Sequence, residues 1–127
     1  MSPPLQPYPD WLELHYVRIG GPVATLRSRS GVVRVELGEG ETIDRITVGI
    51  PDDEAWARLL TTLDEAGFWT WPSNPAHREP HRPQDWEWWL EARWDGRAHL
   101  ATGWNEAPPG FDTVREALYD LVEQVVT

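Results

Sequence analysis

The stretch DWEWWLEARWDGRAHLATGW, residues 85–104, holds five of the nine tryptophans in this 127-residue chain. Its apolar and charged residues alternate, which is typical of a strand with one buried face, and Asp95-Gly96 is a strong turn signal. The stretch therefore predicts a β-hairpin. Because neighbouring residues of a strand point to opposite faces, the register of this hairpin decides which tryptophans form the core.

Two registers are compatible with the sequence. A two-residue loop, 95–96, pairs Trp94 with Arg97 and divides the apolar side chains between both faces. A three-residue loop, 94–96, pairs Arg93 with Arg97 and places Gly96 in a left-handed bulge position. We expect the three-residue loop, because one face then collects the apolar side chains of Trp86, Trp88, Leu90, Ala92, Ala98, Leu100, Thr102 and Trp104.

In this register, the opposite face carries charged residues around one large apolar group, Trp89. A surface tryptophan flanked by carboxylates resembles a sugar-stacking platform or a hot spot for protein binding. The alternative is that Trp89 packs under the proline-rich loop 72–85 or under the N-terminal segment. The candidate partner-binding surface comprises Glu87, Trp89, Glu91, Arg93, Arg97 and His99, together with His77, Arg78, His81 and Arg82 of the loop.

The first half of the chain predicts three or four antiparallel strands. Alternating segments at 11–19, 24–30, 32–37 and 42–50 are separated by glycine-containing turns. In the last of these segments, Ile46, Val48 and Ile50 share one face, and Arg45 and Thr47 share the other.

The period changes to a helical one after Pro51. Asp52 and Asp53 are residues typical of a helix N-terminus, and Gly67 is a typical helix stop, beyond which Phe68 is placed to fold back. A second helix is expected to begin near Pro109-Gly110. The apolar stripes are Trp56, Leu59, Leu60 and Leu63 in the first helix, and Phe111, Val114, Leu118, Leu121, Val122 and Val125 in the second.

These elements predict one α+β domain over residues 11–127, in the order β-β-β(-β)-α-β-β-α. An antiparallel sheet of five or six strands is covered by the two amphipathic helices, and Trp86, Trp88 and Trp104 are expected in the core with Trp56. Trp69 and Trp71 are expected between helix and sheet. Residues 1–10 contain four prolines and are expected to form a flexible tail.

Composition narrows the classes of function. The formal net charge of −10 opposes binding to a phosphate backbone, so we expect no nucleic-acid partner. The chain has no cysteine, which excludes disulfides and thiolate metal sites. No stretch has the roughly 20 apolar residues of a membrane span, and we expect a cytoplasmic protein without a membrane partner.

The sequence contains two weak candidates for a catalytic or metal site. In the expected register Glu91 and His99 are cross-strand neighbours, which permits a general acid/base pair but more often forms a surface ion pair. His77 and His81 are four residues apart, but Pro80 interrupts the helix that would align them and no third ligand is evident. We therefore expect no catalytic, metal or cofactor site, and a protein that is not an enzyme.

The second half resembles a group of small uncharacterised bacterial proteins with a tryptophan-rich strand, a Gly-x-Asn-x-x-Pro segment and a C-terminal helix. The matching segments are GFWTWP, DWEWWLEARWDGR and GWNEAP, the last at residues 103–108, followed by Phe111. Asp85 runs into Trp86 without the glycine of the group, and Ala107 replaces an aromatic residue. The resemblance implies a fold and no function.

The order of elements along the whole chain is similar to emfourin, a proteinaceous inhibitor of thermolysin-like metalloproteases. Gly20-Gly21 and Ile50-Pro51 are the matching points, whereas the aromatic-containing segment of that family is missing after the glycines. The resemblance implies inhibition of a metalloprotease, without assigning an inhibitory loop to particular residues.

We expect a non-catalytic binding module whose partner is another protein. The alternatives are an emfourin-like inhibitor, an immunity or antitoxin protein, and a carbohydrate or small-molecule binder that uses Trp89. An open sheet edge would also allow a homodimer.

Overall fold

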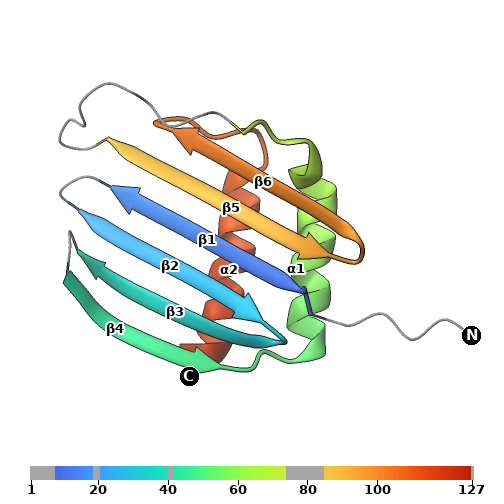
Figure 1. Ribbon diagram of the computed structural model, residues 1–127, viewed down its shortest axis with the longest axis horizontal. Helices are drawn as coiled ribbons and strands as arrows, with labels where there is room; N and C mark the ends of the chain where they lie inside the picture. The colour runs from blue at the N-terminus through green and yellow to red at the C-terminus, as the bar shows by residue number, and fades with distance from the viewer. Residues whose placement is uncertain (1–7, 19–20, 40–41, 74–84, 127) are drawn as a thin grey trace, which may run out of the picture.

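Six strands form one antiparallel sheet in the computed structural model (Figure 1), which describes residues 8–18, 21–39, 42–73 and 85–126. The predicted α+β fold is confirmed, and β1 lies inside the sheet, where it joins the first half of the chain to β5. The strand order is β4-β3-β2-β1-β5-β6. The strands are β1 (Trp11–Arg18), β2 (Pro22–Arg29), β3 (Val32–Glu39), β4 (Thr42–Gly49), β5 (Trp86–Trp94) and β6 (Arg97–Trp104).

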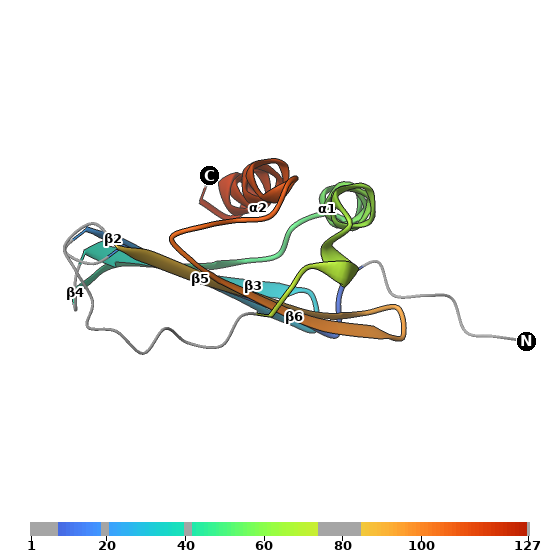
Figure 2. The ribbon, with the colours of Figure 1, turned by 90° about the horizontal axis from the view of Figure 1, so that it is seen from above.

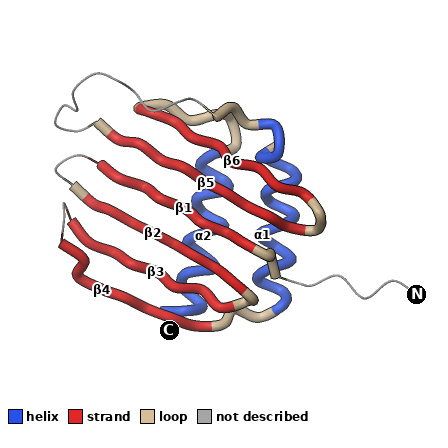
Figure 3. The backbone as a smooth tube through the Cα atoms, in the orientation of Figure 1, coloured by secondary structure: helices blue, strands red, loops and turns tan. Residues whose placement is uncertain are grey.

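Both helices, α1 (Asp53–Ala66) and α2 (Phe111–Val126), lie on the same face of the sheet, as Figure 2 shows and Figure 3 confirms from another direction. A short 3₁₀ helix, η1 (Phe68–Thr70), follows α1. No helix of the described ranges covers the second face of the sheet. Among the described residues, the sheet therefore has a dry face under α1 and α2 and a second face that no helix covers.

The predicted ends of α1 are confirmed. Asp52 is the N-cap, and its side chain accepts a hydrogen bond of 2.8 Å from the backbone N–H of Ala55. Gly67 ends the helix in the left-handed conformation, with φ of 76°, and Phe68 folds back into the core, where it is fully buried.

The core lies between the helices and the inner side chains of the strands. Trp56 of α1 meets Trp94 of β5 edge to face, with ring centroids 5.9 Å apart and an interplanar angle of 85°. Trp71 and Trp88 are also buried, and both contact Phe111 at the start of α2. These aromatic contacts connect both helices to β5.

The structure contradicts the three-residue hairpin loop. Trp94 pairs with Arg97, and Asp95 and Gly96 have φ of 55° and 77°, so the loop has two residues, as in a type I′ turn. The expected register placed Trp94 in the loop, but its indole is buried against Trp56. Burying this large ring stabilises the fold more than collecting smaller apolar residues on one face would.

In the observed register, the side chains of β6 that were expected to face the helices lie on the opposite face of the sheet. Trp88 and Leu90 still point to the helices, whereas Leu100 and Trp104 point away from them. The expectation that Trp104 belongs to the core with Trp56 was therefore wrong. Trp86 is half-buried and packs against the core, as expected.

The apolar face predicted for β4 exists but does not enter the core. Ile46 and Val48 pair with Glu36 and Arg34, whose side chains are on the open face. Both aliphatic side chains are exposed, and so is that of Ile43. The predicted alternation was correct, but its apolar side faces solvent.

The expected flexible tail was wrong for its last three residues; residues 1–7 lie outside the described ranges. Pro9 is fully buried and Tyr8 packs against the core beside Gly31. The N–H of Asp10 donates a 2.8 Å hydrogen bond to the carbonyl of Arg93. The ordered fold therefore begins before β1.

We expect Trp94→Ala to lower the free energy of unfolding by about 3–5 kcal/mol, because it removes a buried ring and leaves a cavity beside Trp56. Urea denaturation followed by far-UV circular dichroism measures this change. Trp89→Ala is the matched control, and we expect it to cost about 1 kcal/mol because its ring is partly in water. Equal costs for the two variants would contradict the observed register.

Candidate binding face

The face of the sheet opposite the helices, here called the open face, presents one row of side chains from each strand. Strand pairing places these side chains in lines that cross all six strands. One line consists of Val48, Arg34, Arg27, Glu13, Glu91 and Leu100, and the next consists of Ile46, Glu36, Thr25, His15, Trp89 and Thr102. The open face is therefore mixed, with charges in its middle and apolar groups toward both edges.

Four of the predicted binding residues lie together on the open face. Glu87, Trp89, Glu91 and Arg93 alternate along β5 with the buried Trp88, Leu90, Ala92 and Trp94. Trp89 is 43% exposed, so the chain leaves this large ring in solvent. Tyr8 and Pro9 pack in the core on the helix side and do not cover Trp89, whereas the alternative of cover by residues 1–7 or by the loop at 74–84 lies outside the described ranges.

The two predicted residues of β6 belong to the helix side and do not join this surface. Arg97 donates to Asp64 of α1 at 2.9 Å, and its guanidinium lies 4.2 Å from the ring centroid of Trp69. A His99 ring nitrogen lies 2.8 Å from the carbonyl oxygen of Trp71. These contacts bind β6 to the segment that follows α1, so both side chains have a structural role.

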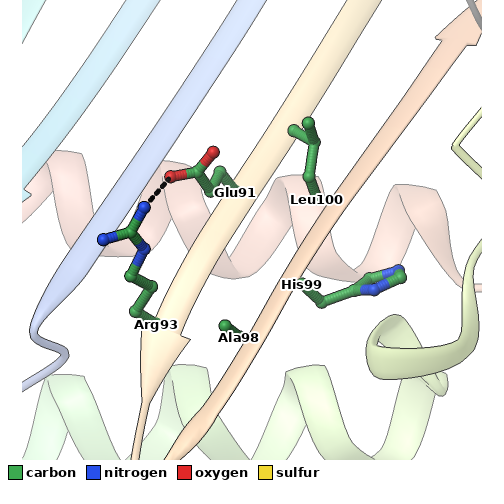
Figure 4. A pocket seen from close by; sticks show the side chains of 5 residues that line it. All are labelled: Glu91, Arg93, Ala98, His99 and Leu100. Carbon is green, nitrogen blue, oxygen red and sulfur yellow. Dashed lines mark ion pairs between the residues drawn. The ribbon is translucent and has the colours of Figure 1, made fainter.

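The proposed pairing of Glu91 with His99 is therefore wrong. Glu91 pairs across the strands with Leu100, and Figure 4 shows His99 pointing toward the segment after α1, away from Glu91. An acid/base pair of these two groups is excluded by the faces on which they lie. The remaining predicted residues, His77, Arg78, His81 and Arg82, are outside the described ranges.

Trp89 is held in place by a group of side chains from β1 and β2. The imidazole of His15 stacks on its indole, with centroids 4.0 Å apart and planes tilted by 40°. His15 also lies 2.6 Å from a carboxylate oxygen of Glu13, which accepts a 3.2 Å hydrogen bond from Arg27. An ordered aromatic anchor loses less conformational freedom on binding than a free one.

Sequence reasoning missed Glu13, His15 and Arg27 as parts of this site. The signal was present, since Glu13 and His15 alternate with the buried Leu12 and Leu14. Their position beside Trp89 was not accessible, because it depends on β1 pairing with β5 about 70 residues later in the chain.

Three carboxylates surround Trp89. Glu87 and Glu91 flank it along β5, and Glu13 is the cross-strand neighbour of Glu91. Two like charges opposite each other destabilise a sheet, and here Arg27 compensates Glu13 while Arg93 approaches Glu91 at 3.7 Å. The centre of the open face is thus an aromatic ring among carboxylates, with arginines at its border.

A depression of about 230 Å³ lies beside this centre, between β5 and β6. Glu91, Arg93, Ala98 and Leu100 line it together with His99, whose imidazole points toward the segment after α1 (Figure 4). Pockets that enclose a small molecule usually have volumes of roughly 300–1,000 Å³. The depression is smaller than such pockets.

The Gly-x-Asn-x-x-Pro segment is explained by the fold, and within it Trp104, the cross-strand neighbour of Glu87, points to the open face. A Cβ at Gly103 would overlap Nε1 of Trp88, which donates to the carbonyl of Glu106 at 3.0 Å. Asn105 has φ of 54°, and its side chain accepts from the N–H of Trp86 at 2.8 Å and donates to Asp85 at 2.9 Å. The segment closes off the start of β5 and leads into α2.

Within the described residues, no group of three or more His, Cys, Asp or Glu side chains is placed to hold a metal ion. Among the same residues, no helix has the length and apolar character needed to cross a membrane. Comparisons with protein-family models, curated proteins and solved structures gave no match, so the two sequence resemblances stay predictions.

We expect Asn105→Ala to lower the free energy of unfolding by about 2–3 kcal/mol, because it removes two side-chain hydrogen bonds and puts alanine in a left-handed conformation. Asn105→Gly keeps the backbone conformation accessible, so it should cost about 1–2 kcal/mol through the hydrogen bonds alone. Chemical denaturation of both variants separates the two effects. A negligible cost for both would show that this clamp does not stabilise β5.

Proposed function

We propose that this chain is a non-catalytic binding protein that recognises a basic protein surface through its open face, centred on Trp89. The observation that carries this proposal is the exposed indole itself, fixed by His15 among the carboxylates Glu13, Glu87 and Glu91. A rigid, half-exposed tryptophan at the centre of a face is typical of a hot spot in protein interfaces.

The extent of the open face favours a protein partner over a small ligand. Exposed apolar groups occur on β3, β4, β5 and β6, so they spread over most of the width of the sheet. A stable protein interface buries roughly 800 Å² on each partner, which needs a broad surface of this kind. The depression beside Trp89 is a local feature of that surface.

Charge favours a basic partner. The chain has a formal net charge of −10, which steers a cationic surface toward it during encounter. A lysine or arginine placed over the free side of Trp89 would gain a cation–π contact and meet the carboxylates of Glu87 and Glu91. Of these two, Glu91 has Arg93 beside it at 3.7 Å.

The arrangement of titratable groups supports binding without catalysis. Glu91 and His99 are on opposite faces of the sheet. His15 and Glu13 form a close pair, but His15 is stacked on Trp89 and Glu13 is bonded to Arg27. Neither member of that pair lines the depression between β5 and β6.

Affinity capture with the wild-type chain and with Trp89→Ala tests the proposal. We expect Trp89→Ala to weaken a purified partner's binding by at least tenfold, because a central aromatic hot spot contributes about 2 kcal/mol or more. The matched control is Tyr119→Ala, which removes an exposed aromatic group from α2, on the other side of the molecule. Isothermal titration calorimetry measures both affinities after circular dichroism has shown that the variants fold.

Glu87→Gln and Glu91→Gln test the charge of the partner. We expect each variant to weaken binding and the affinity of the wild type to fall as salt is added, since screening reduces attraction between exposed charges. A partner that binds Trp89→Ala as tightly as the wild type would overturn the proposed site. A sugar that quenches the tryptophan fluorescence of the wild type but not that of Trp89→Ala would indicate a carbohydrate ligand and overturn the proposed protein partner.

A further inference from the structure

The two edges of the sheet differ in how far they are covered. At β6, the N–H of Thr102 donates to the carbonyl of Pro72 at 3.4 Å, and Ser73 forms a bridge with Thr102. At β4, the backbone pairs with β3 on one side, and no described strand pairs with it on the other. With respect to the described strands, the edge at β4 therefore presents unpaired N–H and C=O groups that permit a further strand to add.

The exposed side chains of β4 are those that a further strand would bury. Ile46 and Val48 are 53% and 58% exposed on the open face, and Ile43 and Ile50 continue this apolar stripe at both ends. Natural edge strands often prevent pairing with charged residues, proline or bulges; the described strand β4 has no lysine or proline, and its charged residues Asp44 and Arg45 lie at its bulge. Its one irregularity is the bulge opposite Leu37 and Gly38, which leaves residues 45–49 in regular register.

Charge on this edge permits self-association even though the whole chain is strongly acidic. β4 contains one acid, Asp44, and one base, Arg45, so the strand is neutral in a chain of net charge −10. On the adjacent strand, Arg34 and Glu36 form an ion pair of 3.0 Å beside the apolar stripe. A second copy approaching this edge meets no uncompensated like charge from these residues.

We infer that two copies of this chain pair through β4 across a two-fold axis, forming a continuous antiparallel sheet of twelve strands. Centred on Thr47, this pairing places Ile46 of each copy opposite Val48 of the other. That register keeps the apolar side chains of both copies on the open face, because paired residues of antiparallel strands share a face. The interface uses the same strand from both copies, as a two-fold dimer requires.

Sedimentation velocity or light scattering over a range of protein concentrations tests the dimer. The monomer has a mass of 14.6 kDa, and we expect the mass to double as concentration rises. Added salt should strengthen the dimer, because it screens the repulsion between two acidic chains while leaving the apolar contact intact. A wild type that stays monomeric at millimolar concentration in high salt would overturn the inference.

Single substitutions locate the interface. We expect Ile46→Lys to abolish the dimer, since it places a charge from each copy in the apolar stripe. Ile46 is exposed in the monomer, so the variant should keep its fold by circular dichroism. The matched control is Leu100→Lys, the same change on the open face at the other edge of the sheet, which should dimerise as the wild type does. Equal loss in both variants would indicate stacking of open faces and overturn edge pairing.

A distance measurement separates edge pairing from other dimers. The chain has no cysteine, so Leu100→Cys carries a single spin label on β6. Strands are about 4.8 Å apart, so edge pairing puts the two labels roughly 50 Å apart across twelve strands. A separation near the roughly 10 Å of stacked sheets would contradict it. This test is independent of the proposed partner at Trp89, because either proposal can be wrong while the other is right.

Discussion

The edge-to-face contact between Trp56 and Trp94 determines much of what the molecule presents to solvent. It places Trp94 under α1 and so requires the hairpin to turn at Asp95 and Gly96. Because side chains alternate along a strand, this single register sends one set of hairpin residues to the helices and the other to the open face. A slip by one residue would exchange the two faces of β6 and leave those of β5 in place.

The described residues contain two α-helices for a six-stranded sheet, and both α-helices pack on the same face. Most of the large apolar side chains lie on the inner face. Of the four tryptophans and one leucine of β5, all but Trp89 point to it. Trp89 is the exception on β5, and it is neither buried nor loose, because His15 stacks on it. The energetic cost of leaving such a ring in water is the physical basis for assigning it a partner.

The two proposed surfaces share the open face but differ in character. Around Trp89 the surface is aromatic and acidic, which suits a basic partner whose approach depends on charge. Along β4 it is aliphatic and neutral, which suits a second copy of an acidic chain. The segment 103–108, which carries the clearest sequence motif, stabilises the start of β5 through its hydrogen bonds with Trp86 and Trp88, and its Trp104 lies on the open face beside Glu87.

The sequence by itself determined the elements: the alternation of β1 to β4, the capped helix α1 from Asp52 to Gly67, and the hairpin at Asp95-Gly96. These are local patterns, in which spacing and turn chemistry act over a few residues. It also identified Trp89 and its neighbours Glu87, Glu91 and Arg93. Only the tertiary structure decided the hairpin register, because burial of Trp94 against a helix 38 residues earlier outweighs the local pattern. The pairing of β1 with β5 likewise brought Glu13 and His15 to Trp89, since strand neighbours distant in sequence are chosen by packing of the whole sheet.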